Sequence, residues 1–292
     1  MSSEQSPFAD LDHLLSQLPA GDTEKCTQLE NELSTKPVTD SFGLKGLLSW
    51  LSMWQEAERL SVKEAHICIL ASAYKGISDI DVVKDYIERA SKGRTPVNHM
   101  CVKNGIGLRI LELAPEVPHD LSQDWSERDC MGAIAFGMEA TASGGDILGL
   151  SDLAPGNQQQ AIKIIKACED LLKDTRDAVN TATYLELLQK HGGREIAAII
   201  GAMIAARSRR LPVLVEGWGA LAAFVLLHSI DNSYVDHVRV ASFSSIEQRD
   251  TLSFANINPV VGEYVGTGQG CGIALAIGVI SGAATLLDVP DV

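Results

Sequence analysis

The chain has 292 residues, of which 46% are hydrophobic and 21% are charged, so it can bury one large core, or one large and one small core. Its formal net charge is −14, with 38 acidic against 24 basic residues. That charge opposes binding to nucleic acid or to an anionic membrane, and only 5% of the residues are aromatic side chains that could stack on bases. We therefore expect no nucleic-acid partner and no membrane partner.

Apolar runs and cysteines indicate a cytoplasmic protein. Residues 1–12 are polar and acidic and contain no apolar signal core. The longest apolar runs, 213–227 and 273–287, are too short to cross a bilayer. Six cysteines and seven histidines show no paired spacing typical of a metal site. We therefore expect free thiols in a reducing compartment and no bound metal.

Hydrophobic periodicity predicts helices that alternate with short apolar strands. Two short amphipathic helices are expected within 7–34, and further helices at 44–55, 80–90, 95–104, 129–143, 158–172, 196–208, 218–228 and 273–280. Strands are expected at 64–73, 107–113 (with alternating burial), 146–150, 211–215 and 238–243. This order indicates an α/β fold with a parallel, Rossmann-like sheet flanked by helices and a smaller helical subdomain.

We divide the chain into three parts. Residues 1–60 form the helical N-terminal part of the small subdomain, 61–262 the α/β domain, and 263–292 a glycine loop and the C-terminal helix. Ligands of parallel sheets lie beyond the carboxyl ends of the strands. The loops expected there are 151–157, Glu216-Gly217 and 262–272.

The third loop, 262–272, alternates glycine with other residues and leads directly into an apolar helix. Glycines allow close backbone approach, and a helix N-terminus offers free N–H groups to a phosphate or carboxylate. A crowded turn packed against a neighbouring helix produces the same pattern, so both interpretations stay open.

A series of segments in one order carries a family signature. It begins with a degraded match at 36–44 and continues with Gly76-Ile77-Ser78, Ala135-Phe136-Gly137-Met138-Glu139-Ala140, Asp146-Ile147-Leu148-Gly149, Gly192-Gly193-Arg194-Glu195-Ile196-Ala197-Ala198, Pro212-Val213-Leu214-Val215-Glu216-Gly217 and Gly268-Gln269-Gly270-Cys271-Gly272. Together they resemble the nicotinate-nucleotide:dimethylbenzimidazole phosphoribosyltransferase family. The resemblance implies a homodimer that uses no cofactor. It also implies transfer of phosphoribose from nicotinate mononucleotide to dimethylbenzimidazole or a similar aromatic base, which yields α-ribazole phosphate.

The chain departs from the family pattern where the chemistry takes place. The family's general-base glutamate is Gln269 here, and Asp152 stands at the glutamate of the family's phosphate loop, in which Gly156-Asn157 is retained. The second phosphate loop has no glycine motif between 158 and 191, and its lysine has only candidates: Lys163, Lys166 and Lys173. Two family histidines are replaced by Phe243 and Asp250.

A neutral amide such as that of Gln269 can hydrogen-bond but cannot accept the proton that a carboxylate base accepts. Loss of a general base costs on the order of 10²–10⁴ in rate. Glu263, Glu216 or Asp152 could supply a replacement carboxylate. Alternatively, Asp152 is an N-cap or turn residue and Glu216 is a hydrogen-bonded loop anchor.

The expected substrate contacts follow from the same loops. Gly156, Asn157, Gly217, Gly266, Gly268 and Gly270 line the predicted anion sites, whereas Ser78 and Tyr86 lie where the family binds the aromatic base. Tyr86 fits equally well as a packing residue on a helix face.

Two functions remain open. The chain is either a phosphoribosyltransferase or a catalytically impaired relative that binds a nucleotide, a base or a regulatory partner. A substrate without the usual phosphate is a further possibility.

Overall fold

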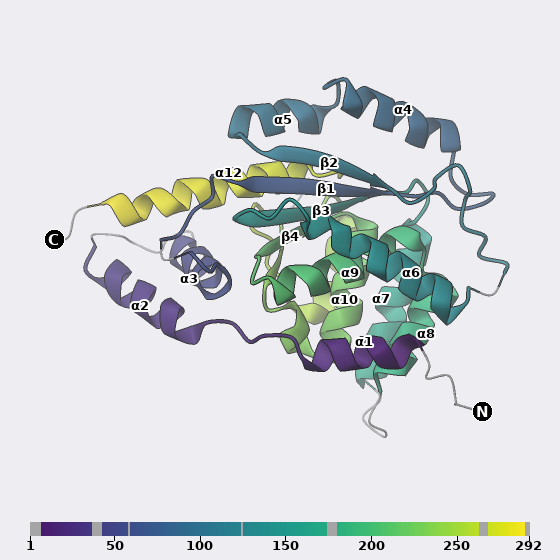
Figure 1. Cartoon of the computed structure of the whole chain (residues 1–292), viewed down its shortest axis with the longest axis horizontal. Coiled ribbons are helices and arrows are strands. Elements are labelled where there is room, and N and C mark those ends of the chain that lie inside the picture. Colours follow the sequence, from purple (N-terminus) through teal and green to yellow (C-terminus); the bar gives the residue numbers. More distant parts are fainter. Residues whose placement is uncertain are drawn as a thin grey trace.

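The computed structural model describes residues 7–36, 43–57, 59–123, 125–173, 180–262 and 268–289. These residues form one sheet of five parallel strands in the order β2-β1-β3-β4-β5 (Figure 1). The strands are β1 (Ala65–Ala71), β2 (Gly107–Glu112), β3 (Ile147–Leu153), β4 (Val213–Glu216) and β5 (Val238–Val240). The predicted α/β fold with a parallel sheet is confirmed.

The strand order places a topological switch point between β1 and β3. Strand β1 pairs with β2 on one side and with β3 on the other, so the connections leave it in opposite directions. Loops after β1 and β3 therefore diverge at the carboxyl edge and leave room for a ligand. Register places Ser151 of β3 beside Glu216 of β4 at this edge.

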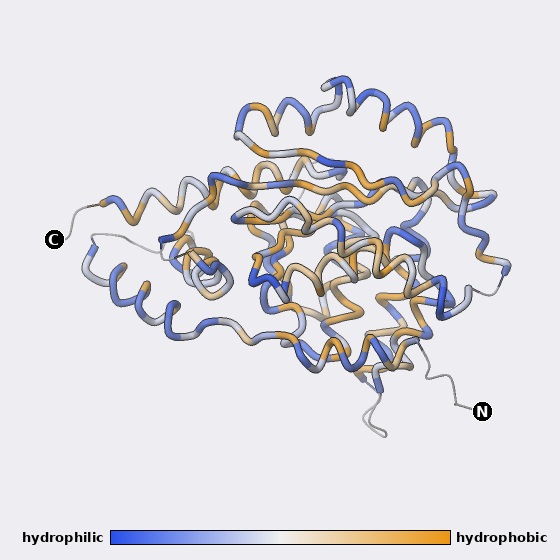
Figure 2. The backbone as a smooth tube through the Cα atoms, viewed as in Figure 1, coloured by the Kyte–Doolittle hydropathy of each residue, from blue (hydrophilic) through white to orange (hydrophobic). Residues whose placement is uncertain are grey.

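Helices cover both faces of the sheet, as Figure 1 shows. One face carries α4 (Ile80–Ser91), α5 (Pro96–Asn104) and α12 (Cys271–Ala284), and the other carries α6 (Glu127–Gly137), α7 (Gln158–Lys173), α9 (Arg194–Ser208) and α10 (Trp218–Ile230). Successive residues of a strand point to opposite faces. Thus Cys68 and Leu70 join the core beneath α9, whereas Ile67 and Ile69 join the core beneath α12. Figure 2 shows the apolar strands between these layers.

Three predictions of secondary structure were wrong or incomplete. Strand β3 continues to Leu153, so Asp152 lies on the strand and not in the following loop. Strand β2 shows no alternation, because a sheet edge leaves its residues half-buried on both faces. Helices α8 (Thr181–His191) and α11 (Ile246–Thr251) were not predicted. Helices α7 and α8 together occupy all but Asn180 of the described part of 158–191, the interval in which the second phosphate loop was sought.

The N-terminal helices lie in two different places. Helix α1 (Pro7–Ser16) buries Phe8, Leu11 and Leu15 in the larger core and contacts α6 and α8. Helices α2 (Thr23–Ser34) and α3 (Leu44–Trp54) instead share a small cluster with the end of α12. The division at residues 60 and 262 stays a prediction.

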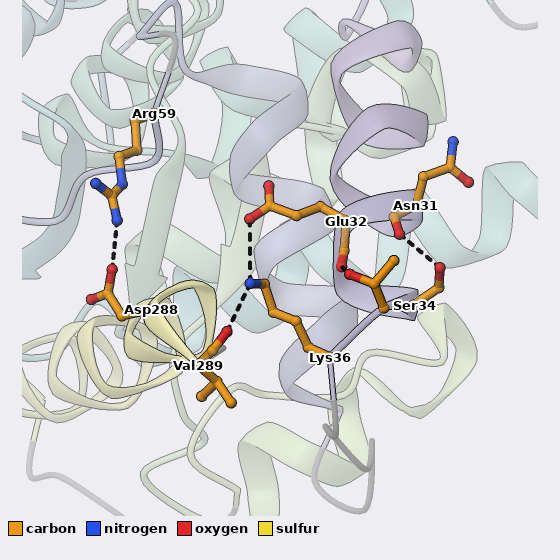
Figure 3. A network of polar contacts seen from close by, with 8 residues as sticks. Asn31, Glu32, Ser34, Lys36, Arg59, Asp288 and Val289 are labelled. Atoms are coloured by element: carbon orange, nitrogen blue, oxygen red, sulfur yellow. Dashed lines mark hydrogen bonds and ion pairs between the residues drawn. The ribbon is translucent and has the colours of Figure 1, made fainter. Parts of the chain in front are cut away.

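Polar contacts tie α2 to the C-terminal segment, as Figure 3 shows. Lys36 Nζ donates to the carbonyl oxygen of Val289 at 2.8 Å and lies 3.8 Å from Glu32 Oε1. Arg59 pairs with Asp288 on the surface nearby. Segments from the two ends of the chain are thus held together.

Helices α6 and α9 cross at Gly137, which belongs to a signature segment, and at Gly201. A Cβ on Gly137 would lie 1.8 Å from the carbonyl oxygen of Ala198, and one on Gly201 would lie 1.8 Å from that of Ile134. Only glycine allows so close a contact between two backbones. These glycines therefore serve helix packing.

Helix α12 and the turn after it form a longer helical run than the sequence predicts. Among the described residues, 271–288 form one helical run of 18 residues with mean hydropathy 1.8, long and apolar enough to cross a membrane. The prediction that this run is too short was therefore wrong. Its contacts with β1, β3 and β4 account for the apolar composition, since 44% of it is buried in the protein.

Candidate active site

Three acidic residues with buried carboxyl groups lie at the edge of the sheet where the strands end. Asp152 lies on β3, Glu216 ends β4, and Glu195 lies in the first turn of α9. Their exposed fractions are 8%, 0% and 0%. Burial raises the pKa of all three, because an apolar environment disfavours the charged form, and it raises the pKa of Glu216 to about 7.

Glu216 is held by the backbone of the glycine loop and of α12. Its Oε1 accepts from Gly268 N at 3.2 Å, and its Oε2 accepts from Gly272 N at 2.9 Å and Ile273 N at 3.3 Å. Gly268, Gln269 and Gly270 all have positive φ, at 80°, 50° and 87°. This left-handed turn brings the N–H groups together on one carboxylate. The chain's own Glu216 therefore occupies the anion site predicted at this helix start.

Asp152 holds the start of α10 in a similar way. Its Oδ1 accepts from Ala220 N at 3.1 Å. Gly217 has φ of 104°, and a Cβ there would lie 2.3 Å from Asp152 Oδ1. A side chain at Gly217 would displace the carboxyl group, which explains why the segment after β4 begins with glycine. Asp152 thus lies inside the site but is engaged by the backbone.

Glu195 is a buried residue that the sequence interpretation passed over. Tyr74 OH donates to its Oε1 at 2.6 Å, and Ser72 Oγ donates to its Oε2. Asn157 Nδ2 also approaches Oε1 at 3.4 Å. The signal was available, since Glu195 is an acidic residue at the start of an otherwise apolar helix and within a signature segment.

Ser78 and Gly156 join the two loops at the switch point. Ser78 Oγ donates to the carbonyl oxygen of Pro155 at 2.6 Å and accepts from Tyr74 N at 2.8 Å. A Cβ on Gly156 would lie 2.3 Å from Ile77 Cγ2, and φ at Gly156 is 88°. Both residues therefore hold the loop after β1 against the loop after β3.

Helix α7 begins directly after this junction. Gln160 N and Ala161 N donate to the carbonyl oxygen of Asn157 at 3.0 and 2.9 Å. The N–H groups of Gln158 and Gln159 have no acceptor among the described residues. Unlike the start of α12, where Glu216 accepts from two N–H groups, this helix start keeps free donors among the described residues.

The remaining predicted residues are scattered around the site. Tyr86 on α4 is 8% exposed and packs in the core beneath α4 and α12, where burial raises its pKa to about 12. Gln269 is half-buried, and its side chain has no hydrogen-bond partner among the described residues. Gly270 packs against Ile67, whose Cγ2 would lie 3.0 Å from a Cβ there. Glu263 and Gly266 lie outside the described residues.

Two buried hydroxyl groups leave hydrogen-bonding capacity unused. Ser151 and Ser242 are both 0% exposed, and within the described part of the chain neither Oγ has a partner. Ser151 is next to Asp152 and pairs in register with Glu216. Ser242 Oγ and Glu216 Oε1 would lie 2.3 and 2.8 Å from a Cβ on Gly272. Buried polar groups without a partner are uncommon in folded proteins, so these two hydroxyls are candidates to bond a polar ligand or a water molecule.

Comparison with known proteins identifies the family. A family model described as phosphoribosyltransferase matches residues 171–289. Nicotinate-nucleotide–dimethylbenzimidazole phosphoribosyltransferase from Agrobacterium fabrum is 31% identical, with 97% of this chain and 93% of the relative covered. The chain belongs to this phosphoribosyltransferase family. The Rhizobium etli enzyme of the same name is 30% identical and covers 97% of this chain.

Solved structures share the fold. The crystal structure titled CobT from Thermus thermophilus has a TM-score of 0.77 at 17% identity and covers 92% of this chain. A second crystal structure from the same organism, titled as the nicotinate-nucleotide–dimethylbenzimidazole phosphoribosyltransferase, has a TM-score of 0.78, also at 17% identity. In each case 97% of the solved chain is matched.

Proposed function

We propose that this phosphoribosyltransferase moves phosphoribose from nicotinate mononucleotide to dimethylbenzimidazole or a similar aromatic base. The observation that carries the proposal is 31% identity to an enzyme of that name over 97% of the chain. In the transfer, a ring nitrogen of the base bonds to ribose C1′ and nicotinate leaves with the electron pair of the broken bond. No cofactor takes part in this exchange.

The buried carboxyl groups supply electrostatic stabilisation. The donor's ribosyl-pyridinium group is cationic, and positive charge shifts toward the ribose ring as the glycosidic bond breaks. Asp152, Glu195 and Glu216 lie in a site of low exposure, where ionised carboxylates favour such charge. Their raised pKa values set the pH range over which this charge is present.

Proton removal does not depend on Gln269. The attacking nitrogen already carries a lone pair, so the proton on the other ring nitrogen leaves after bond formation has begun. Both oxygens of Glu216 and both oxygens of Asp152 accept hydrogen bonds from the protein, so neither is positioned as a free base. Glu263 or solvent takes the proton, at a lower rate than the glutamate of the family.

The donor's phosphate binds at the start of α7. The free N–H groups of Gln158 and Gln159 and the helix dipole favour an anion there, after the Gly156-Asn157 turn. The glycine loop is a poorer phosphate site, because Glu216 fills it and would repel a second anion. Gly268 and Gly270 shape that loop, while Ser78 and Tyr86 form the side nearest the base.

The assembly and location follow from the family and the cysteines. We infer a homodimer with sites near its interface, and a cytoplasmic protein because all six cysteines are free. Sedimentation of the purified chain tests the dimer.

Product analysis tests the reaction. The purified chain is incubated with nicotinate mononucleotide and dimethylbenzimidazole, and nicotinate and α-ribazole phosphate are quantified by chromatography. The proposal requires equal amounts of both products and none without either substrate. Absence of both products at high protein concentration would refute it.

A further inference from the structure

Asn157 is held between two carboxyl groups. Its Nδ2 lies 2.8 Å from Asp152 Oδ2 and 3.4 Å from Glu195 Oε1. A Cβ on Gly219 would lie 3.1 Å from the same nitrogen, so α10 closes the remaining side. Carboxylates accept hydrogen bonds, so the side-chain atom facing both of them must be the amide nitrogen and not the oxygen.

This arrangement leaves the amide oxygen of Asn157 available. The two hydrogens on Nδ2 are directed to Asp152 and Glu195, and within the described part of the chain no donor reaches Oδ1. Asn157 is 6% exposed, and its Oδ1 is not among the fully buried unpaired atoms, so this oxygen stays accessible to a donor from a ligand.

The surrounding charge determines which ligand group fits. An amide oxygen flanked by two carboxyl groups repels phosphate and carboxylate but accepts a hydrogen bond from a neutral hydroxyl. Nicotinate mononucleotide carries two hydroxyls on its ribose ring. Asn157 begins the loop-to-helix junction at which we place the donor's phosphate, so the ribose of the same molecule lies within reach of its side chain.

We propose that Asn157 Oδ1 accepts a hydrogen bond from a ribose hydroxyl of the donor, and that Glu195 is the positioning residue that keeps this oxygen turned toward the substrate. The proposal rests on the proposed function for the identity of the ligand. Ser72 and Tyr74, which follow β1, both donate to Glu195, so its carboxyl group keeps its place when one of these two bonds is removed. Discrimination between ribose and deoxyribose is the expected consequence.

Calorimetric titration tests this without requiring turnover. Nicotinate mononucleotide and its 2′-deoxy and 3′-deoxy forms are titrated into the wild-type chain and into Asn157→Ala, Glu195→Leu and Tyr74→Phe. We expect the wild type to bind the ribose form roughly 5-fold or more tightly than one of the deoxy forms, as one hydrogen bond predicts. Asn157→Ala removes the acceptor and Glu195→Leu removes the group that orients it, so both should reduce that ratio to about 1–2, the range left when the bond is absent.

Tyr74→Phe is the matched control, because it removes a bond to Glu195 but keeps the contact between Glu195 and Asn157. It should keep the wild-type ratio. If Glu195→Leu does not fold, Asn157→Ala still decides the question. Equal wild-type affinity for all three ligands, or an undiminished ratio in folded Asn157→Ala, overturns the inference even if products form. A hydroxyl-dependent ratio without product supports the inference and refutes the proposed function.

Discussion

Replacement of Glu216 by glutamine tests how the glycine loop is held. In Glu216→Gln, one oxygen remains to accept hydrogen bonds, but an NH₂ group now faces a backbone N–H that previously had an acceptor. An unsatisfied buried donor costs about 1–3 kcal/mol, so the variant should be less stable than the wild type at pH 5. The size of the loss should vary with pH, because only the wild-type side chain ionises.

The direction in which wild-type stability changes with pH follows from the raised pKa of Glu216. The folded value of about 7 exceeds the reference value of 4.5, so the folded state binds the proton more tightly than the unfolded state. Tighter proton binding by Glu216 therefore stabilises the folded wild type in full below pH 4.5, and this stabilisation is lost as the pH rises through 7. With 1.36 kcal/mol per pKa unit, the loss between pH 5 and pH 8 is about 2.5 kcal/mol.

Denaturant unfolding at pH 5, 6, 7 and 8 measures this difference. We expect the destabilisation of Glu216→Gln relative to the wild type to shrink by about 2.5 kcal/mol from pH 5 to pH 8. Glu116→Gln makes the same chemical change on an exposed side chain and should follow the wild-type curve. A constant difference between Glu216→Gln and wild type across this range would refute the argument from burial.

Three further changes have definite expected outcomes. Gln269→Glu adds a carboxylate without changing the side-chain size or the positive φ, and it should raise the rate of nicotinate release by about 10-fold or more in steady-state assays. Gly137→Ala should cost about 3 kcal/mol or more in denaturant unfolding, whereas Gly132→Ala on the same helix, with open space around it, should cost nothing. Burial lowers the pKa of His237 to about 3, so the wild type should lose about 3 kcal/mol of stability through this residue between pH 7 and pH 4. His237→Phe should therefore lose about 3 kcal/mol less than the wild type over that range. An unchanged rate, equal stability of the two alanine variants or an unchanged acid transition would contradict these expectations in turn.

The sheet could be predicted because each strand is short, apolar and separated by an amphipathic helix. The unpredicted helix α8 buries Tyr184, Leu185 and Leu188, which are preceded by two threonines and followed by three polar residues. Such a short, polar segment has a weak periodic signal, and its buried face is determined by α7 and α10. The length of β3 likewise depends on pairing with β1 along its whole length, which local sequence does not reveal.

The site was only partly predictable for a related reason. Spacing and motif identified Asp152, Glu216 and the Gly268–Gly270 turn as residues of the carboxyl edge. The group that occupies each helix start depends on tertiary structure. Glu216, for example, reaches the glycine loop from more than 50 residues away in the chain. Glu195 was passed over because its partners come from the loop after β1 and from the residue before α7.

The central claim is that the glycine loop holds the chain's own Glu216, while the donor's phosphate binds at the start of α7. A crystal structure with nicotinate mononucleotide tests this most directly. We predict phosphate density at the N–H groups of Gln158 and Gln159, with Glu216 still bonded to Gly272 and Ile273. Phosphate density within the glycine loop, with the Glu216 carboxyl group displaced from it, would contradict the account.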